Sequence, residues 1–506
     1  MPVKKLIVLF YPEVSDKHYS IPYAFLSLER NLRDLPVELL ILDERHQPDW
    51  EKVVTERSRE ILLAGVSAMV GNQMISGRKF SQFVKTQGRI PIVWGGWFVT
   101  EYPEMALAED FIDFIVRGQG EIPFRELILA LLNGTTVYEG IPGLGYRMNG
   151  KTHIPEPSPW TDTYRLPRWN FGLLPLEPYL ENQGKTFHYI ASQGCPCTCN
   201  FCLMSSLQQH HHIHQTAGQI ADDLEYVKMK YGSIRHIKFN DDNLLARPVL
   251  VRDLCRILKE RNTGLFWTAS AHIGLFNKLF SDADLQMMKA AGCSMIYAGA
   301  ESGDADILEK TGKKINPHDI VTFVRRLHKA GIPCSCSFMI CFPGQGIRDL
   351  NLSLKLILKL FRINRAFKLS LSYYLPLPAN AFREKALALG FRIPATFSEF
   401  EISLQQGFAF PWITEKMKHR VDTLRSVMLP AIDKDYRRYY YAGQRAGAAF
   451  LFTLYRPFTE FRLLAGYYRP AADTMLMGFI LKLAGIKSDI RYAKNSIMQG
   501  IRAIGY

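Results

Sequence analysis

Short, nearly unbroken runs of apolar residues alternate with stretches of helical periodicity through most of this chain. In the first part the runs are residues 6–11, 37–43, 61–66, 90–94 and 111–117. Strands that lack polar alternation are buried on both faces, which is typical of a parallel sheet covered by helices on each side. We therefore predict an α/β fold in which residues 1–145 form a doubly wound parallel sheet.

The same alternation returns over residues 186–385. Its apolar runs are residues 186–191, 236–240, 265–269, 295–298, 333–340 and 367–375. Six βα units predict a partial (β/α)6 barrel with its active site at the carboxyl ends of the strands. Residues 146–185 are rich in proline and predict a linker, with a hairpin turn at Asn149-Gly150 near its start. Residues 386–506 predict a mainly helical C-terminal region.

Cysteine usage constrains the compartment and the chemistry. Four of the nine cysteines lie within eight residues, at Cys195, Cys197, Cys199 and Cys202. An odd, clustered count argues against a secreted disulfide framework and favours a metal or cluster in a reducing compartment. The apolar run at the N-terminus is short for a signal peptide, and no window reaches the ~18 apolar residues of a membrane span. We expect a cytoplasmic protein.

The clustered cysteines directly follow the first strand of the second α/β region. Thiolates suit both iron–sulfur clusters and zinc. Four cysteines could hold one zinc ion, although four ligands in eight residues are cramped for a single tetrahedral ion. A zinc-stabilised binding module without catalytic activity is therefore the alternative to an iron–sulfur enzyme.

Without Cys197 the motif reads CxxxCxxC, which resembles the signature of radical S-adenosylmethionine (SAM) enzymes. This resemblance implies that Cys195, Cys199 and Cys202 hold three irons of a 4Fe–4S cluster, that SAM chelates the fourth iron, and that Cys197 is a bystander. By position in the family's motifs, the residues implied to contact SAM are Phe201, Asp241, Asp242, Gly299, Glu301 and Ser302. The loop at residues 340–345 resembles the family's Gly-hydrophobic-Pro-Gly-Glu loop, but Cys341 and Gln345 replace its Gly and Glu.

The first region resembles the cobalamin-binding subclass at residues 95–100 with Pro103, at residues 116–121 and at residues 143–147. This subclass includes class B methyltransferases and proteins of the anaerobic Mg-protoporphyrin ester cyclase type. The loops after the third, fourth and fifth strands also lie where doubly wound sheets bind ligands. The residues implied to contact cobalamin are Ser67, Val70, Gly71, Gly95, Gly96, Gly118, Gln119 and Glu121. The Asp-x-His-x-x-Gly motif that gives cobalt a histidine is absent, because Asp16-Lys17-His18 lacks the glycine and His46 follows the wrong strand. We expect cobalt without a protein histidine.

The resemblance implies an enzyme that makes a 5′-deoxyadenosyl radical and methylates an unactivated carbon of a small or lipid-like substrate. Oxidative cyclisation or rearrangement without methyl transfer is the alternative. An external electron donor such as flavodoxin or ferredoxin is implied as a partner, and no catalytic side chain can be named from the sequence. The histidines at 210, 211, 212 and 214 predict a loop near the active-site mouth, with His214 facing substrate, rather than a second metal site.

The C-terminal region is basic and aromatic. Of the net charge of +14, +7 arises from residues 431–506. Its aromatic and apolar segments are residues 439–441, 450–452, 458, 461, 467–468 and 475–483. Such a mixture predicts an apolar substrate pocket, a peripheral helix on the inner face of an anionic membrane, or a helical cap packed on the barrel. No aromatic-basic ribbon typical of RNA-binding proteins is evident, so a nucleic-acid partner is not expected.

Overall fold

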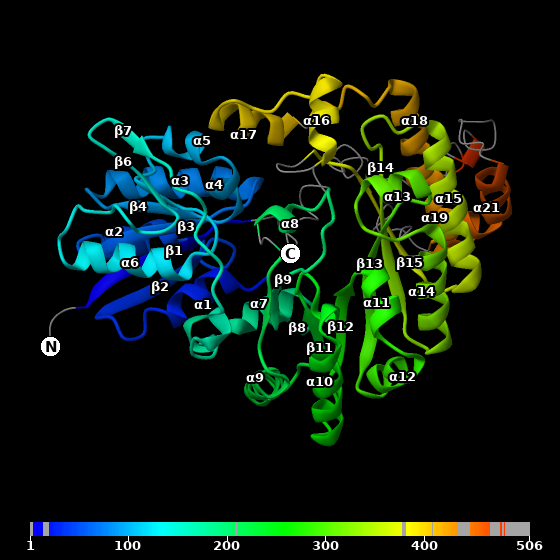
Figure 1. The fold of residues 1–506 in the computed structure, drawn as a ribbon, viewed down its shortest axis with the longest axis horizontal. Coiled ribbons are helices and arrows are strands. Elements are labelled where there is room, and N and C mark those ends of the chain that lie inside the picture. The colour runs from blue at the N-terminus through cyan, green and yellow to red at the C-terminus, as the bar shows by residue number, and fades with distance from the viewer. Residues whose placement is uncertain are drawn as a thin grey trace.

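The computed structural model describes residues 4–13, 20–207, 210–376, 381–406, 408–433 and 446–465, together with residues 476, 477 and 480. Two α/β units lie side by side, and a helical region follows them in the chain (Figure 1). The sheet topology of both units confirms the predicted fold class.

The N-terminal sheet has the strand order β2-β1-β3-β4-β5-β6-β7, and its first five strands run parallel. These five strands are β1 (Lys5–Tyr11), β2 (Val37–Asp43), β3 (Ile61–Ser67), β4 (Ile92–Gly95) and β5 (Phe114–Val116). Each overlaps an apolar run predicted to be a strand. The chain order reverses between β1 and β3, which creates the type of switch point where doubly wound sheets bind ligands.

Helices cover both faces of this sheet, as predicted. One face is covered by α1 (Tyr23–Arg30) and α6 (Glu121–Leu132). The other is covered by α2 (Trp50–Arg57), α3 (Asn72–Thr86), α4 (Trp97–Glu101) and α5 (Pro103–Leu107). In β1, Ile7 and Leu9 belong to the first core, whereas Leu6, Val8 and Phe10 belong to the second. Both faces of the strand are buried, which explains its unbroken apolar sequence.

The hairpin with its turn at Asn149-Gly150 is present, but it belongs to the N-terminal sheet. Its strands, β6 (Leu144–Met148) and β7 (Lys151–His153), continue the sheet from β5 in antiparallel direction. Asn149 and Gly150 have φ angles of 50° and 72°, the conformation that a two-residue hairpin turn of type I′ requires. The domain boundary predicted at residue 145 is therefore too early, because the hairpin pairs with the otherwise open edge of β5.

The second unit is an open six-stranded parallel sheet in the order β15-β14-β13-β12-β11-β8. Its strands are β8 (Thr186–Tyr189), β11 (His236–Phe239), β12 (Phe266–Ala271), β13 (Cys293–Glu301), β14 (Cys334–Ile340) and β15 (Lys368–Tyr373). Its main helices are α9 (Ala217–Lys230), α10 (Pro248–Glu260), α11 (Ile273–Leu279), α12 (Asp282–Ala290), α13 (Ala305–Lys310), α14 (Pro317–Lys329) and α15 (Ile347–Ile363). Capping boxes at Thr216 and Asn316 fix where α9 and α14 begin. The predicted partial barrel is confirmed.

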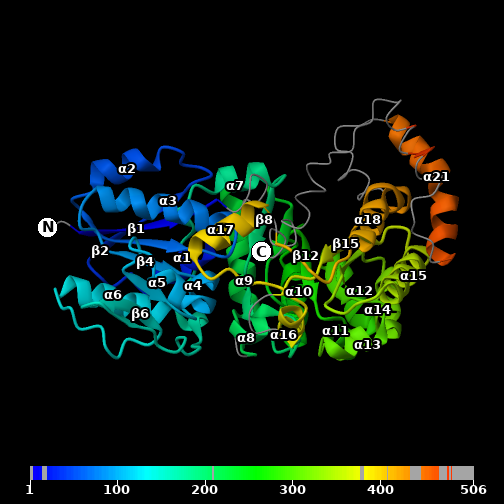
Figure 2. The ribbon, with the colours of Figure 1, turned by 90° about the horizontal axis from the view of Figure 1, so that it is seen from above.

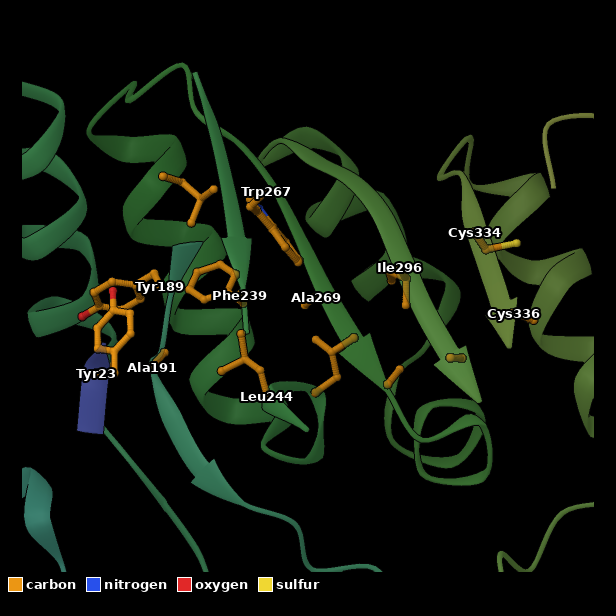
Figure 3. Packing of buried hydrophobic residues seen from close by; sticks show 14 of the residues in the cluster. Tyr23, Tyr189, Ala191, Phe239, Leu244, Trp267, Ala269, Ile296, Cys334 and Cys336 are labelled. Atoms are coloured by element: carbon orange, nitrogen blue, oxygen red, sulfur yellow. The ribbon is translucent and has the colours of Figure 1, made fainter. Parts of the chain in front are cut away.

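The segment between the two units is packed, whereas we predicted a linker. It contains two short 3-10 turns, η1 (Thr163–Arg165) and η2 (Phe171–Leu173), and the helix α7 (Leu176–Asn182). Trp169 lies in the same hydrophobic core as α1 and β8. Figure 3 shows Tyr23 of α1 beside Tyr189 of β8, with ring centroids 6.4 Å apart. The hydroxyl of Tyr23 also donates to the backbone oxygen of His188 at 2.9 Å. One continuous core therefore joins the two units.

The C-terminal region first returns to the N-terminal unit. It does so through α16 (Ala381–Ala388) and α17 (Phe397–Gln406), which run across from the barrel (Figures 1 and 2). Phe397 is fully buried, and its ring makes edge-to-face contacts with Trp94, Phe98 and Phe111 at 6.0, 5.5 and 5.8 Å. Glu401 forms an ion pair with Arg78 at 3.0 Å. The expectation of a cap on the barrel alone is therefore incomplete.

The rest of the described C-terminal region packs on the barrel. It comprises α18 (Glu415–Thr423), the π-helical turn η4 (Leu424–Met428), α19 (Leu429–Ile432) and α21 (Ala446–Ala465), of which α21 contacts α15 and α19. Among the described residues, no helix is both long enough and apolar enough to cross a bilayer. The aromatic residues 439–441 and 467–468, most of residues 475–483, and His18 lie outside the described residues.

Candidate functional site

The four clustered cysteines lie on the loop between β9 (Ser192–Gly194) and α8 (Leu203–Leu207), beyond the carboxyl end of β8. β9 pairs antiparallel with β10 (His212–His214), which places Gly194 opposite His212. Gly194 has a φ of 90°, and a Cβ atom there would lie 2.0 Å from the backbone oxygen of His211. Only glycine fits this position, so the cysteine loop begins at a fixed point just before Cys195.

The middle of the cysteine loop is held by the segment after α13. The backbone nitrogen of Asn200 donates to the backbone oxygen of Thr311 at 2.8 Å, and its side-chain amide donates to that of Lys310 at 3.4 Å. A Cβ atom at Gly312 would lie 2.8 Å from Cγ of Asn200. Glycine at 312 therefore leaves the space that Asn200 occupies.

The thiols of the loop differ in their ionisation. Hydrogen bonds from the Cys197 thiol and backbone and from the Asn243 side chain lower the pKa of Cys195 to about 6. Asn243 Nδ2 lies 3.5 Å from the Cys195 sulfur. Burial raises the pKa of Cys199 to about 12, and the charge of Lys313 opposes that rise. Of these two thiols, Cys195 is closer to the thiolate form that binds iron.

The two predicted aspartates follow β11 and stabilise β9. Asp241 accepts hydrogen bonds from Ser192 Oγ at 2.5 Å and from the backbone nitrogen of Ala191 at 3.3 Å. Its side chain is almost inaccessible, and burial raises its pKa to about 7. Asp242 accepts from the backbone nitrogen of Gly194 at 2.9 Å. Both residues hold the start of the cysteine loop, and Asp241 presents no open surface to a ligand.

Two asparagines beside these aspartates were not among the predicted site residues. Oδ1 of Asn240 and Oδ1 of Asn243 are buried and have no hydrogen-bond partner among the described residues. Such atoms are rare in folded proteins, and an amide oxygen is an acceptor suited to an ammonium group. The sequence signal for these asparagines is the polar run Asn240-Asp241-Asp242-Asn243, of which only the two aspartates were predicted to contact SAM.

A buried ion pair lies at the end of β13. Lys313 Nζ is 2.5 Å from Glu301 Oε1 and donates to the backbone oxygen of Gly299 at 2.7 Å. A Cβ atom at Gly299 would lie 1.9 Å from Glu301 Oε1 and 2.5 Å from Lys313 Nζ. Glycine at 299 thus provides the space for the ion pair. Lys313 belongs to no motif in the sequence, so it was not among the predicted site residues.

The charge of Lys313 faces the cysteine loop. Burial alone would lower its pKa, but Glu301 and the sulfur atoms of Cys199 and Cys202 outweigh burial and raise it. The ammonium lies 5.9 Å from the centre of the Phe201 ring. The structure therefore brings Phe201, Glu301 and Lys313 together beside the cysteines.

Ser302 does not join this group. It is fully buried, and its Oγ lies 3.2 Å from Oγ of Ser353 on α15. The next residue, Gly303, packs so closely on α15 that a Cβ atom there would lie 2.5 Å from the backbone oxygen of Leu352. Ser302 therefore contacts α15, and whether it also contacts SAM stays a prediction.

Hydrogen bonds and ring stacking stabilise the loop at residues 341–345, which departs from the family's Gly-hydrophobic-Pro-Gly-Glu pattern. Gln345 Oε1 accepts from the backbone nitrogen of Phe342 at 3.1 Å, and Trp412 Nε1 donates to the backbone oxygen of Cys341 at 2.8 Å. Phe342 stacks on Tyr374 with ring centroids 5.0 Å apart. Gln345 therefore shapes the loop from within.

The chemistry of the donor set fits a 4Fe–4S cluster, in which each thiolate of the cysteine loop would bind a different iron. Within the described ranges, no three Cys, His, Asp or Glu side chains converge closely enough to enclose one metal ion. The partnerless oxygens of Asn240 and Asn243 leave acceptors for a ligand next to the loop.

A cavity of about 280 Å³ lies at the carboxyl ends of β3, β4 and β5. Six of the eight residues implied to contact cobalamin line it: Ser67, Gly95, Gly96, Gly118, Gln119 and Glu121. Nothing lies within 4 Å of where a Cβ atom of Gly95 would be, so this glycine widens the cavity. Val70 and Gly71 do not line it and instead lead into α3.

The cavity continues to the second unit. Trp160, Gln193 and Leu207 complete its lining, and Gln193 precedes Cys195 by two residues. Trp160 Nε1 donates to the backbone oxygen of Leu207, at the end of α8, at 3.4 Å. No histidine lines the cavity among the described residues. His46 packs on Tyr179 of α7 instead, with ring centroids 4.4 Å apart.

The histidine run forms β10 and its approach, and its members have separate partners. His210 Nδ1 lies 3.0 Å from the backbone oxygen of Cys197, and the ring of His211 stacks on Trp160 at 5.9 Å. Arg247 Nε donates to Nδ1 of His212 at 2.9 Å, and burial together with the Arg247 charge lowers the pKa of His212 to about 4. These contacts give the run a structural role beside the cysteine loop, and whether His214 faces substrate stays a prediction.

Comparison with known proteins places this geometry in a family. Residues 189–357 match the model of the radical SAM superfamily. This part of the chain is therefore similar to radical SAM domains. The match begins in β8 and ends in α15, so it includes the cysteine loop, both asparagines and the Glu301–Lys313 pair.

Two curated relatives of this chain bear two different activities in their names. An uncharacterized methyltransferase of Pyrococcus horikoshii is 33% identical over 272 residues, which cover 53% of this chain and 58% of that protein. The anaerobic magnesium-protoporphyrin IX monomethyl ester cyclase of a Synechocystis species is 24% identical over 344 residues, covering 67% of this chain and 68% of the cyclase. The chain thus spans less than two thirds of the first relative's length.

A solved structure supports the fold beyond the radical SAM domain. The radical SAM methyltransferase TsrM of Kitasatospora setae, solved with cobalamin and a 4Fe–4S cluster bound, superposes with a TM-score of 0.64 at 20% identity. The superposition covers 78% of this chain and 84% of TsrM. The shared fold therefore includes an N-terminal sheet in front of the radical SAM domain.

Proposed function

We propose that this chain is a cobalamin-dependent radical SAM methyltransferase that acts on a carbon of a small or lipid-like molecule. The observation that carries the proposal is the cavity of the N-terminal sheet, whose lining reaches Gln193, two residues before Cys195. A methyl donor in the cavity and SAM at the cysteine loop would therefore be neighbours. The methyltransferase names of a relative and of a solved structure support the same reaction.

In this proposal Cys195, Cys199 and Cys202 hold a 4Fe–4S cluster, and the loops after β3, β4 and β5 hold cobalamin. When bound, the cluster supplies the electron that splits SAM into methionine and a 5′-deoxyadenosyl radical, and cobalamin supplies a methyl group. The cofactors carry the chemistry, and the protein positions them. Asn240 and Asn243 offer acceptors to the SAM ammonium, and Lys313 adds a positive charge beside the thiolates. The continuous core around Tyr23 and Tyr189 holds the two units in a fixed relative position.

The second candidate is oxidative cyclisation or rearrangement without methyl transfer. It is favoured by the similarity to the magnesium-protoporphyrin cyclase, which covers 67% of this chain. Both reactions need the same cluster and an external electron donor of the flavodoxin or ferredoxin type. They differ in their SAM products, because remaking the methyl donor from SAM releases S-adenosylhomocysteine.

The test uses the full chain, purified without oxygen and reconstituted with iron, sulfide and hydroxocobalamin. After addition of SAM and dithionite, we expect both 5′-deoxyadenosine and S-adenosylhomocysteine by mass spectrometry. Cys199→Ala should lose the cluster absorbance and the 5′-deoxyadenosine, whereas Cys197→Ala, the matched control in the same loop, should keep both. If 5′-deoxyadenosine forms without S-adenosylhomocysteine, the second candidate replaces the first. If the protein binds only zinc and forms neither of these two products, both candidate functions are rejected.

A further inference from the structure

One face of α21 is a row of large apolar side chains exposed to solvent. The row consists of Phe450, Leu454, Phe458, Phe461 and Leu464, which we call the α21 stripe. Their spacing of four, four, three and three residues keeps them on one side of an α-helix. Phe458 and Phe461 expose 61% and 72% of their surface. An exposed contiguous apolar surface of this kind marks an interaction site.

The opposite face of the same helix explains why α21 is fixed in this orientation. Phe452, Tyr455, Thr459 and Arg462 are buried where α21 packs on α15 and α19. Arg462 Nη1 donates to the hydroxyl of Tyr455 at 3.3 Å, which ties the buried face together. The stripe therefore points away from the barrel. Figure 2 shows α21 at the outer end of the molecule, far from the N-terminal unit.

The charges beside the stripe are mostly positive. Glu460 is the only acidic residue of α21, and it is neutralised by Arg456 at 2.8 Å. Arg362, in the last turn of α15, and Arg365, just after this helix, each lie 3.9 Å from the same carboxylate and are half or more exposed. Three arginines thus surround one glutamate along the flank of an aromatic row. The last 76 residues carry a net charge of +7.

We infer that the α21 stripe docks the protein on an anionic lipid surface. Aromatic rings enter the boundary between headgroups and acyl chains, and flanking arginines bind the anionic headgroups. No described helix can span the bilayer, so the contact is peripheral. This inference does not depend on the proposed reaction, because it uses no residue of the cysteine loop or of the cavity.

The test is co-sedimentation of the full chain with vesicles of phosphatidylcholine, with and without phosphatidylglycerol. We expect binding to the anionic vesicles that falls with added salt, and weak binding to the neutral ones. The double variant Phe458→Ser/Phe461→Ser should bind the anionic vesicles at least about tenfold more weakly than the parent, since it removes two large apolar groups. Arg362→Gln/Arg365→Gln should reduce the preference for phosphatidylglycerol.

The matched control is Met229→Ser/Val249→Ser, which removes two exposed apolar side chains from α9 and α10 and should bind like the parent. Circular dichroism of each variant checks that it remains folded. Equal binding of the Phe458/Phe461 variant and the parent would overturn the inference. A parent protein that does not co-sediment with anionic vesicles would overturn it as well. A parent that is dimeric by light scattering, and becomes monomeric in this variant without binding vesicles, would assign the stripe to a second copy of the chain.

Discussion

Lys313 combines two features that seldom occur together, complete burial and a full positive charge. Its ammonium is stabilised by the Glu301 carboxylate at 2.5 Å and by the backbone oxygen of Gly299 at 2.7 Å. Removing one member of a buried pair leaves an uncompensated charge, whereas replacing both by apolar groups is often neutral. The pair lies beside Cys199 and Cys202, so under the proposed function its ammonium contributes to the electrostatic field at the cluster.

Lys313→Met should destabilise the barrel and make the cluster harder to reduce. The loss of the partner of Glu301 should cost about 3–5 kcal/mol of unfolding free energy, which is roughly 6–20 °C of thermal midpoint for a unit of this size. Removing a positive charge near the thiolates should also lower the cluster's midpoint potential. Calorimetry of the protein and potentiometry followed by electron paramagnetic resonance measure the two effects.

The control for this variant is Lys310→Met, which removes an exposed lysine from the end of α13. The double variant Lys313→Met/Glu301→Met should recover most of the stability but keep a shifted potential. A potential in Lys313→Met equal to that of the parent would restrict Lys313 to a structural role.

Asp241 should give the fold a characteristic pH dependence. Its pKa of about 7 in the folded protein lies well above the ~3.9 of an unfolded aspartate. The folded state therefore holds a proton that the unfolded state has lost, so the free energy of unfolding falls as pH rises from about 4 to about 7, by at most ~1.4 kcal/mol per pH unit. Asp241→Asn should flatten this fall in thermal midpoints measured across that range, while Asp306→Asn, at an exposed site, should leave it unchanged.

At the scale of secondary structure, the hairpin of β9 and β10 decides where the cysteine loop leaves the barrel. Three pairs connect the strands, and the last of them joins Gly194 to His212. Asp241 and Asp242 brace the same strand from the end of β11. His212 and His214 thus have a structural role through their backbone, because β10 pairs with β9 and fixes its position.

Gly194→Ala tests this dependence. The new Cβ atom would lie 2.0 Å from the backbone oxygen of His211, and the φ of 90° would be strained as well. We expect loss of the β9–β10 pairing and at least a severalfold drop in iron and sulfide bound per chain. Gly134→Ala is the control, because Gly134 also has a positive φ but faces open space, so it should cost only about 1–2 kcal/mol. Normal iron content in Gly194→Ala would disprove the dependence.

The strands of both units and the cysteine loop could be predicted from sequence, because their signals are local. Unbroken apolar runs identify buried parallel strands, and a motif such as CxxxCxxC lies within one loop. Lys313 could not be predicted, since its meaning depends on a fold that brings it to Glu301 and Cys199. The hairpin of β6 and β7 was predicted with the correct turn, but its pairing with β5 was not, because pairing between distant strands leaves no periodicity in either strand.

At the scale of the whole molecule, α17 connects the end of the barrel to the N-terminal sheet. Its residues Phe397, Phe400 and Leu404 are buried in the core that includes α3 and α4. Phe98 of α4 lies within 6.3 Å of both phenylalanine rings. Two neighbours of Phe98, Trp97 and Thr100, line the cavity. The C-terminal region therefore supports one wall of a cavity formed by residues some 300 positions earlier in the chain.

Phe397→Ala should weaken cobalamin binding while leaving the cysteine loop intact. Loss of a fully buried phenylalanine costs about 3–5 kcal/mol, and the loss falls on the packing of α4 rather than on the barrel, because the rings around Phe397 belong to the N-terminal unit. Spectral titration with hydroxocobalamin should show a lower affinity, with unchanged iron and sulfide content. Ile402→Ala removes a half-exposed side chain from the same helix and should bind cobalamin like the parent. A variant at 397 that lost iron and cobalamin together would instead mean that α17 stabilises both units as one cooperative structure.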